Sequence, residues 1–98
     1  MQPGETAGLR ADSEAALAIA PEMTVARFNL GLALLLASES ERALREYRRA
    51  AKEETEISNI RREREYLERE VPGPASGRGG VISLLRAREA ELDGMAGA

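Results

Sequence analysis

Residues 26–50 read ARFNLGLALLLASESERALREYRRA, and this stretch decides the fold. Its first half carries small and large apolar residues at spacings of three and four, the period of an amphipathic α-helix. They are Ala26, Leu30, Ala33, Leu34 and Ala37. Further leucines lie on other faces of the same helix, so we expect a helix over 22–37 that is covered on more than one side.

The second half of this stretch continues into a long run without glycine or proline. Residues 39–70 are rich in Arg, Glu, Ala and Leu, which are strong helix formers. Ser38, followed three residues later by Glu41, resembles a capping box that would start a new helix. We therefore expect one long helix up to residue 70 and leave open whether it is interrupted near 53–56.

Shorter segments flank this centre. Apolar residues between Thr6 and Ala20 predict a short helix that Pro21 ends. Residues 71–80 hold four glycines and two prolines, which predicts a linker before a last amphipathic helix over 81–93. A length of 98 residues suits one domain, and we expect a single helical domain over 1–98.

The composition excludes several classes of chemistry. The chain has no Cys and no His, so disulfides, thiolate chemistry, imidazole bases and the common zinc sites are excluded. Aromatic residues are only 3% of the chain, and 14 basic residues stand against 17 acidic ones for a net charge of −3. We expect no enzyme, no catalytic residue, no metal and no cofactor, and instead a helical binding or scaffolding module.

An internal period points to a repeat family. Ala50 lies 34 residues after Ala16, at the matching place of a later helix. Between them runs a pattern of small and large residues, and the fragment AALAIAP before it has an Ala-Leu pair ahead of Pro21. This pattern resembles the tetratricopeptide repeat (TPR). The resemblance implies an all-α fold of TPR-like antiparallel helix pairs, a right-handed α-solenoid fragment with about one and a half repeats over 6–52.

The resemblance also implies structural roles and contains departures. Gly31 and the small Ala43 would let the paired helices approach closely, and Tyr47 would fill the groove against the next helix. Ser38 stands where the family usually has a turn glycine, and Thr55 stands where it has a closing proline. Without that proline, the second helix need not stop at Thr55. An expected aromatic residue is shifted to Phe28.

The segment after the repeat has a different pattern. Over 53–70 it shows a heptad-like series of Ile57, Ile60, Arg64, Leu67 and Val71. This series favours a long C-terminal capping helix that covers the last repeat, with an intermolecular coiled coil as the alternative. In the first case the final short helix at 81–93 folds back across the linker and packs beside it.

The function that follows is protein–protein interaction. We expect an adaptor or scaffold that binds a partner peptide or helix through a concave surface, mostly from 22–37. The candidate partner-binding residues are Arg27, Asn29, Leu30, Leu34 and Tyr47. In chaperone-binding members of the family, an Asn at the place of Asn29 contacts a peptide's terminal carboxylate, but that clamp needs basic residues on flanking repeats. The alternative is a self-associating module, a homo-oligomer that uses its apolar helix faces, because solenoids usually need about three repeats.

Charge and hydropathy limit the remaining partners. Over 39–70 nine bases alternate with ten acids, so no sustained positive field exists and we expect no nucleic-acid binding. We expect a solvated helix face with pairs such as Glu41–Arg45 and Glu65–Arg69. The most apolar window, 28–37, is shorter than the about 20 residues that span a bilayer, so we expect no membrane partner and a cytoplasmic location.

Overall fold

Helices account for the secondary structure of this chain. The computed structural model describes residues 3–71, 73 and 77–96, and within these residues there is no strand. The expected all-α class is therefore confirmed. The helices are α1 (Pro3–Ile19), α2 (Thr24–Leu36), α3 (Ser40–Glu53), α4 (Ile57–Glu70) and α5 (Arg78–Ala96).

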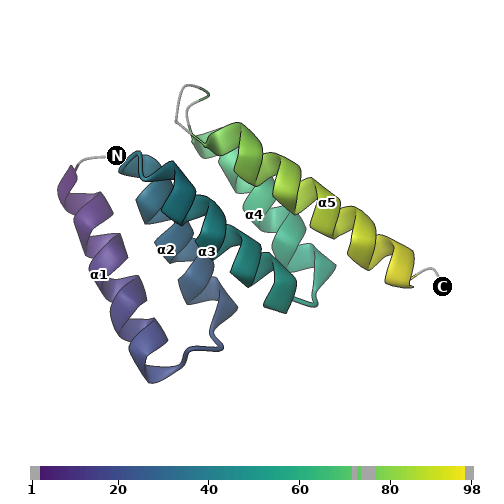
Figure 1. Ribbon diagram of the computed structural model, residues 1–98, viewed down its shortest axis with the longest axis horizontal. Helices are drawn as coiled ribbons and strands as arrows, with labels where there is room; N and C mark the ends of the chain where they lie inside the picture. The colour runs from purple at the N-terminus through teal and green to yellow at the C-terminus, as the bar shows by residue number, and fades with distance from the viewer. Residues whose placement is uncertain (1–2, 72, 74–76, 97–98) are drawn as a thin grey trace.

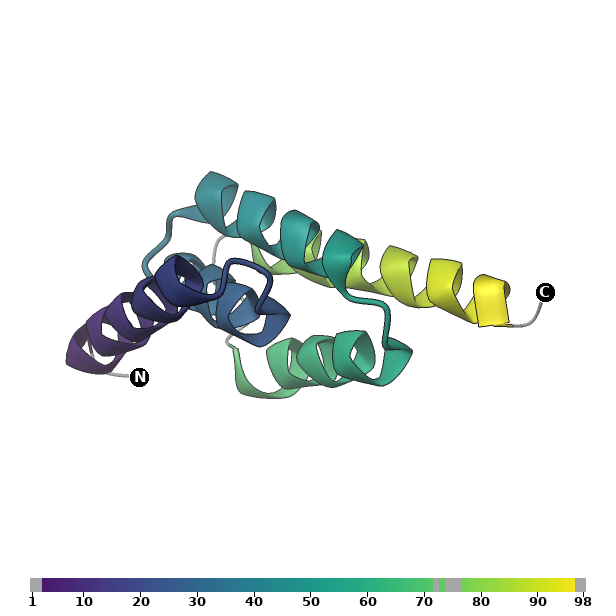
Figure 2. The ribbon, with the colours of Figure 1, turned by 90° about the horizontal axis from the view of Figure 1, so that it is seen from below.

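The helices form a flattened body of 45 × 33 × 20 Å. In Figure 1, α3 and α5 lie in front of α2 and α4, and Figure 2 shows the two layers from below. Helix α1 packs on α2, α2 on α3, and α5 packs on both α3 and α4. Helix α5 therefore joins the second half of the chain to the first, and this arrangement leaves α1, α2 and α4 along one face.

The core lies where these helices meet. Helix α2 buries nine of its 13 residues, as expected for a helix covered on more than one side. Each of the three later helices also contributes fully buried side chains. The largest side chains without exposed surface are Tyr47, Leu34, Leu35, Ile60, Leu67, Leu85 and Val81.

Helices α2 and α3 approach closely at one glycine. A Cβ atom on Gly31 would lie 2.8 Å from two carbons of the Tyr47 ring, so the ring rests directly on the backbone of α2. The Tyr47 hydroxyl donates a hydrogen bond to Glu63 of α4 at 3.1 Å. The close approach at Gly31 and the reach of Tyr47 toward the next helix agree with the roles that the sequence implied.

The turn between α2 and α3 differs from the expected capping box. Ser38 has a φ of +64°, its N–H donates to the Leu35 carbonyl at 3.1 Å, and the Glu39 N–H donates to the Leu34 carbonyl at 2.9 Å. This pair of bonds is the Schellman motif that ends a helix. Glu39 is the N-cap of α3 and makes no side-chain capping bond. The capping box of Ser38 and Glu41 is wrong because Ser38 terminates α2.

The helical run over 39–70 is interrupted at 54–56, within the region 53–56 where the sequence left an interruption open. Helix α3 ends at Glu53 and α4 begins at Ile57. Between them, Glu54 is buried, and its two carboxylate oxygens accept from the Thr24 hydroxyl at 2.9 Å and from the Glu56 N–H at 3.2 Å. These bonds hold the extended backbone of Glu54 and turn the chain.

Helix α5 stabilises the same break from the other side. The Arg88 guanidinium donates to the carbonyls of Ala51, Lys52 and Glu54 at 2.7, 3.3 and 3.0 Å. These are the carbonyls that the end of α3 leaves without a helical donor. Helix α3 therefore ends at Glu53 even though residue 55 is a threonine and not a proline.

The heptad-like stripe packs inside the chain. Ile60, Leu67 and Val71 are buried in the core, and α4 packs on α5. This burial favours the covering helix over the intermolecular coiled coil.

The last helix is longer than expected, beginning at Arg78 and ending at Ala96 in place of 81–93. Arg78 lies within the expected linker but donates to the carbonyls of Leu67, Glu68 and Val71 at 3.3, 3.2 and 3.0 Å. It thereby fixes the first turn of α5 against the end of α4, and residues 72 and 74–76 of that linker lie outside the described residues.

Candidate functional site

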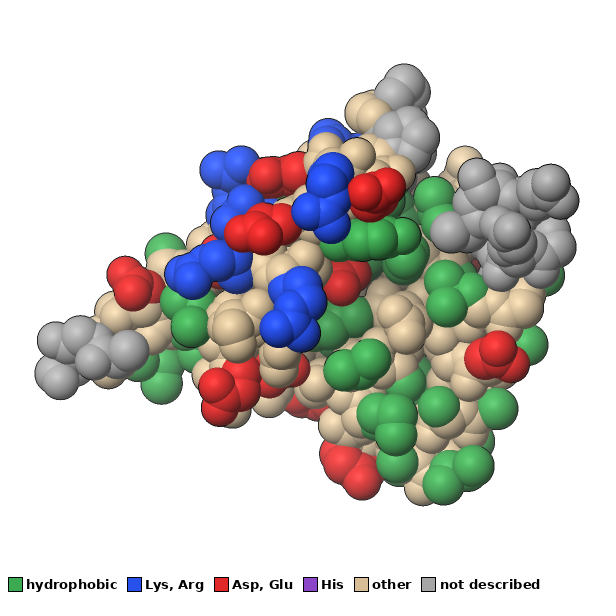
Figure 3. Space-filling view, turned by 180° about the vertical axis from the view of Figure 1, so that it is seen from behind, with side chains coloured by type: hydrophobic (Ala, Val, Ile, Leu, Met, Phe, Trp, Pro, Cys, Tyr) green, Lys and Arg blue, Asp and Glu red, His purple; other side chains and the backbone are tan. Residues whose placement is uncertain are grey.

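Helices α1, α2 and α4 enclose two adjoining cavities on the face seen in Figure 3. The larger one, about 340 Å³, is lined by Leu9, Asn29, Leu32, Glu63 and Tyr66. The smaller one, about 140 Å³, is lined by Val25, Phe28, Asn29, Glu54, Asn59, Arg62 and Glu63. We call these two cavities together the α2–α4 groove. In Figure 3, hydrophobic side chains gather over α1 and α2 and charged ones over α4.

Asn29 is the one proposed partner-binding residue that the structure places in this groove. It is half-buried and lines both cavities. Val25, Asn29 and Leu32 follow one another at spacings of four and three along α2, so they share the face of the helix that looks toward α4. Asn29 is therefore accessible to a partner.

Arg27 lies elsewhere and is used inside the fold. Its side chain is 7% exposed, one terminal nitrogen donates to Glu46 of α3 at 2.9 Å, and the other donates to the Pro21 carbonyl at 2.9 Å. Its Nε is buried without a partner among the described residues. Arg27 thus ties the start of α2 to α3, and we do not carry it forward as a partner-binding residue.

Leu30, Leu34 and Tyr47 also belong to the core. Their exposed fractions are 7%, 0% and 0%. The Tyr47 ring lies 6.0 Å from the Phe28 ring, in a tilted arrangement. A partner cannot reach these three side chains in this structure, so their role is to hold α2 and α3 together.

Glu63 is the groove residue that sequence reasoning missed. Its Oε1 accepts the Tyr47 hydroxyl, and no Arg or Lys in the described part of the chain pairs with it. Burial raises the pKa of the Glu63 carboxyl, and the hydrogen bond from Tyr47 offsets part of this rise. Burial, and then the charge of Glu63, raises the pKa of Tyr47 well above its ordinary value. The sequence signal was weak, because Glu63 is one of many acids in a charged helix.

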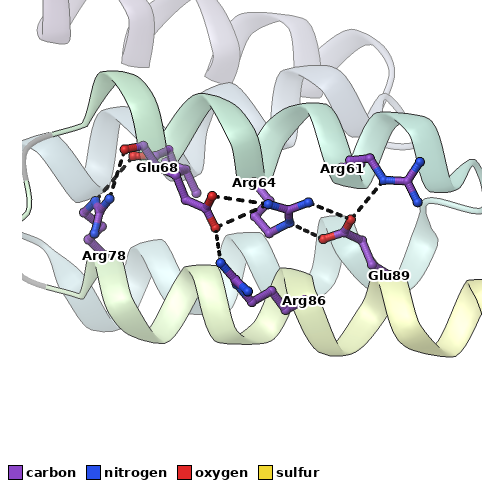
Figure 4. A network of polar contacts seen from close by, with 7 residues as sticks. Arg61, Arg64, Glu68, Arg78, Arg86 and Glu89 are labelled. Carbon is purple, nitrogen blue, oxygen red and sulfur yellow. Dashed lines mark hydrogen bonds and ion pairs between the residues drawn. The ribbon is translucent and has the colours of Figure 1, made fainter.

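Three other charged residues of α4, Arg61, Arg64 and Glu68, join it to α5. Figure 4 shows a network in which Glu89 accepts from Arg61 and Arg64, while Glu68 accepts from Arg64 and Arg86. The Arg64 hydrogen bond lowers the pKa of Glu89, and the Arg86 hydrogen bond lowers that of Glu68. Arg61 and Arg64 are directed toward α5, and Arg86 of α5 is directed toward Glu68 of α4 (Figure 4).

Ion pairs of i,i+4 spacing form along single helices, such as Arg49–Glu53 and Arg64–Glu68, both at 3.2 Å, but they are not the two pairs expected. Within residues 3–71, 73 and 77–96, neither Glu41–Arg45 nor Glu65–Arg69 forms, and Arg69 pairs with its neighbour Glu70 at 3.0 Å. The i,i+4 spacing allows such pairs but does not require them, because exposed pairs contribute little.

A third cavity of about 250 Å³ lies between α3 and α5. It is lined by Arg48, Ala51, Lys52, Leu84, Ala87, Arg88 and Glu91. Because Arg88 already donates to three carbonyls and to Glu91, this cavity offers fewer free polar groups than the α2–α4 groove.

Neither a metal cluster nor a bilayer-spanning helix is found in the described part of the chain. No three of its acidic side chains gather so as to hold a metal ion, and none of its helices has the length and apolarity to cross a bilayer. A comparison with protein-family models finds no match, and comparisons with curated proteins and with solved structures find none either.

Proposed function

We propose that this chain is a TPR-like helical module that binds a segment of a partner protein in the α2–α4 groove. Two features support the proposal: the repeat-like pattern of residues 26–50, and the pairing of α2 with α3 and of α4 with α5. The observation that carries it is the groove itself, where Asn29 lies between two cavities that each combine apolar side chains with polar ones. A groove with an apolar lining and a few polar groups is the usual form of a binding site.

The test is a selection of peptides followed by mapping of where they bind. A phage-displayed library of random peptides is selected on the immobilised protein, and enriched peptides are titrated into isotope-labelled protein. We expect shifts of the amide resonances of Leu9, Asn29 and Tyr66, and weaker binding by Asn29→Ala. Peptides that shift only residues around Leu84, or no enriched peptide at all, would contradict the proposal.

Self-association is a second candidate, favoured by exposed apolar side chains near the α1–α2 turn. Ile19, Met23 and Val25 are 87%, 44% and 61% exposed. Sedimentation velocity at several concentrations tests this candidate. An oligomer that Ile19→Glu dissociates supports it, whereas a monomer at every concentration contradicts it. Ile19→Glu suits the test because a side chain so exposed contributes little to the fold.

In either case we propose a binding role without catalysis. A cytoplasmic location stays a prediction of the sequence.

A further inference from the structure

The larger cavity of the α2–α4 groove combines one charge with an apolar wall. Glu63 is its only charged lining residue, Asn29 and Tyr66 add an amide and a phenol, and Leu9 and Leu32 supply aliphatic surface. These groups come from three helices, so the folded chain brings them together from positions far apart in the sequence.

The carboxylate of Glu63 lacks a cation. Its one recorded interaction in the described part of the chain is the hydrogen bond that Oε1 accepts from Tyr47. The neighbouring Arg64 is bound to Glu68 and Glu89, and Arg61 is bound to Glu89. Arg62 lines the smaller cavity but forms no ion pair with Glu63. A partly buried carboxylate in this state attracts a positive ligand, because burial strengthens its field.

We propose that the larger cavity receives a lysine or arginine side chain of the partner segment. This inference rests on the proposed function and specifies its ligand. The ammonium or guanidinium group pairs with the Glu63 carboxylate through charge-assisted hydrogen bonds, and the Asn29 side-chain oxygen accepts a further one.

The aliphatic stem of that side chain has its own contact surface. Lys and Arg carry apolar stems that pack well on hydrocarbon walls, which Leu9 and Leu32 provide. The Tyr66 ring adds a face that attracts cations. The adjoining smaller cavity has mostly polar lining residues, but Val25 and Phe28 give it an apolar side that an apolar residue next to the basic one can contact.

The charge of the whole molecule agrees with such a ligand. The chain has a net charge of −3, and an opposite charge on the partner increases the rate of association. An acidic peptide would instead place a second carboxylate beside Glu63. The preference for a basic segment therefore follows from both the cavity and the overall charge.

The experiment compares two isosteric variants with the same change in charge. Glu63→Gln removes the proposed partner of the basic side chain, and Glu65→Gln removes an exposed carboxylate of the same helix that lies outside both cavities. Peptides enriched from the random phage-displayed library are synthesised with and without their Lys or Arg. Their affinities are measured by isothermal titration calorimetry, and circular dichroism checks the fold of each variant.

We expect enriched peptides to carry a basic residue beside an apolar one. Glu63→Gln, or loss of the basic residue, should weaken binding by about tenfold or more, while Glu65→Gln leaves it within about twofold. Peptides that shift the Asn29 and Tyr66 resonances but lack a required basic residue, or bind Glu63→Gln equally well, overturn this inference and leave the proposed function standing. If no peptide binds the groove, both are overturned.

Discussion

Helices α2 and α3 pack so closely at Gly31 that one added methyl group would clash with Tyr47. The Cβ of an alanine at Gly31 would stand 2.8 Å from the Tyr47 ring, and that ring is fully buried and held by Glu63. We expect Gly31→Ala to lower the free energy of unfolding by about 1–3 kcal/mol, because an overpacked core must shift. Urea denaturation followed by circular dichroism measures this change.

Gly8 supplies a matched control for Gly31. It lies in α1 with nothing within 4 Å of an added Cβ, so Gly8→Ala should raise stability by about 0.5–1 kcal/mol through helix propensity alone. Tyr47→Leu should reduce the penalty of Gly31→Ala in a double-mutant cycle. Equal effects of the alanine substitutions at positions 8 and 31 would contradict the close packing.

The buried carboxyl of Glu63 makes stability depend on pH in an unusual direction. Its pKa is raised by burial, so the native state holds the proton more tightly than the unfolded state does. The stabilisation that comes from this tighter proton binding is fully present below the ordinary glutamate pKa of about 4.3. It is lost as the pH rises through the pKa of Glu63 in the native state. Glu63→Gln should therefore be more stable than the native chain at neutral pH.

The difference between these two proteins should disappear in acid. Thermal melts of both proteins from acid to neutral pH measure the difference in stability, and Glu65→Gln serves as the control at an exposed position. A loss of stability in Glu63→Gln at neutral pH would show that the charge of Glu63 stabilises the native fold.

The sequence predicts the role of a residue where the spacing of apolar residues along one helix is enough to define it. The close approach at Gly31 agrees with the structure, whereas Arg27 and Leu34, which we expected to contact a partner, are buried. A period identifies which residues share a face, and it does not say which face meets which neighbour. The sequence did not predict a role for Glu63, because that role depends on a hydrogen bond from Tyr47, 16 residues away on another helix.

At the scale of elements, the end of α2 carries a strained residue. Ser38 adopts a φ of +64°, in the left-handed region that a glycine occupies without steric cost. Ser38→Gly should raise the free energy of unfolding by about 0.5–1 kcal/mol, because relief of strain outweighs the added freedom of the unfolded chain. A shift in the urea midpoint measures this gain.

The neighbouring residue provides the control for Ser38. Ala37 has a φ of −85°, which any residue adopts, so Ala37→Gly should destabilise the protein. If both glycine substitutions lower the midpoint, the left-handed conformation of Ser38 is not a source of strain.

The boundaries that the sequence left open or placed elsewhere are those set by distant side chains. The chain breaks between α3 and α4 without glycine or proline, because Thr24 binds the Glu54 carboxylate and Arg88 binds the nearby carbonyls. Similarly, α5 begins at Arg78 because this side chain caps the end of α4. Local propensity favoured helix across the first break and a linker at the second, and tertiary contacts overrode it at both.

At the scale of the whole molecule, the second half of the chain completes the core of the first. Helix α3 turns Tyr47, Ala50 and Ala51 inward, and α5 packs on both α3 and α4. The sequence alone predicted a covering role for the region after residue 52. It did not predict that α5, separated from α3 by a whole helix, provides a direct contact with it.

A chain that ends at Lys52 should therefore fail to fold cooperatively. It lacks fully buried residues of α4 and α5, among them Ile60 and Leu85, each of which contributes about 1.5–3 kcal/mol of hydrophobic stabilisation. It also leaves Tyr47 without its acceptor, Glu63. Because domains of this size are stable by only about 5–15 kcal/mol, the loss removes most of the margin. Thermal and urea melts should show no cooperative transition, whereas a chain that ends at Asp93, and so lacks the exposed Gly94 and Met95, should melt like the intact protein. An unchanged transition in the chain that ends at Lys52 would mean that α1, α2 and α3 form a domain by themselves.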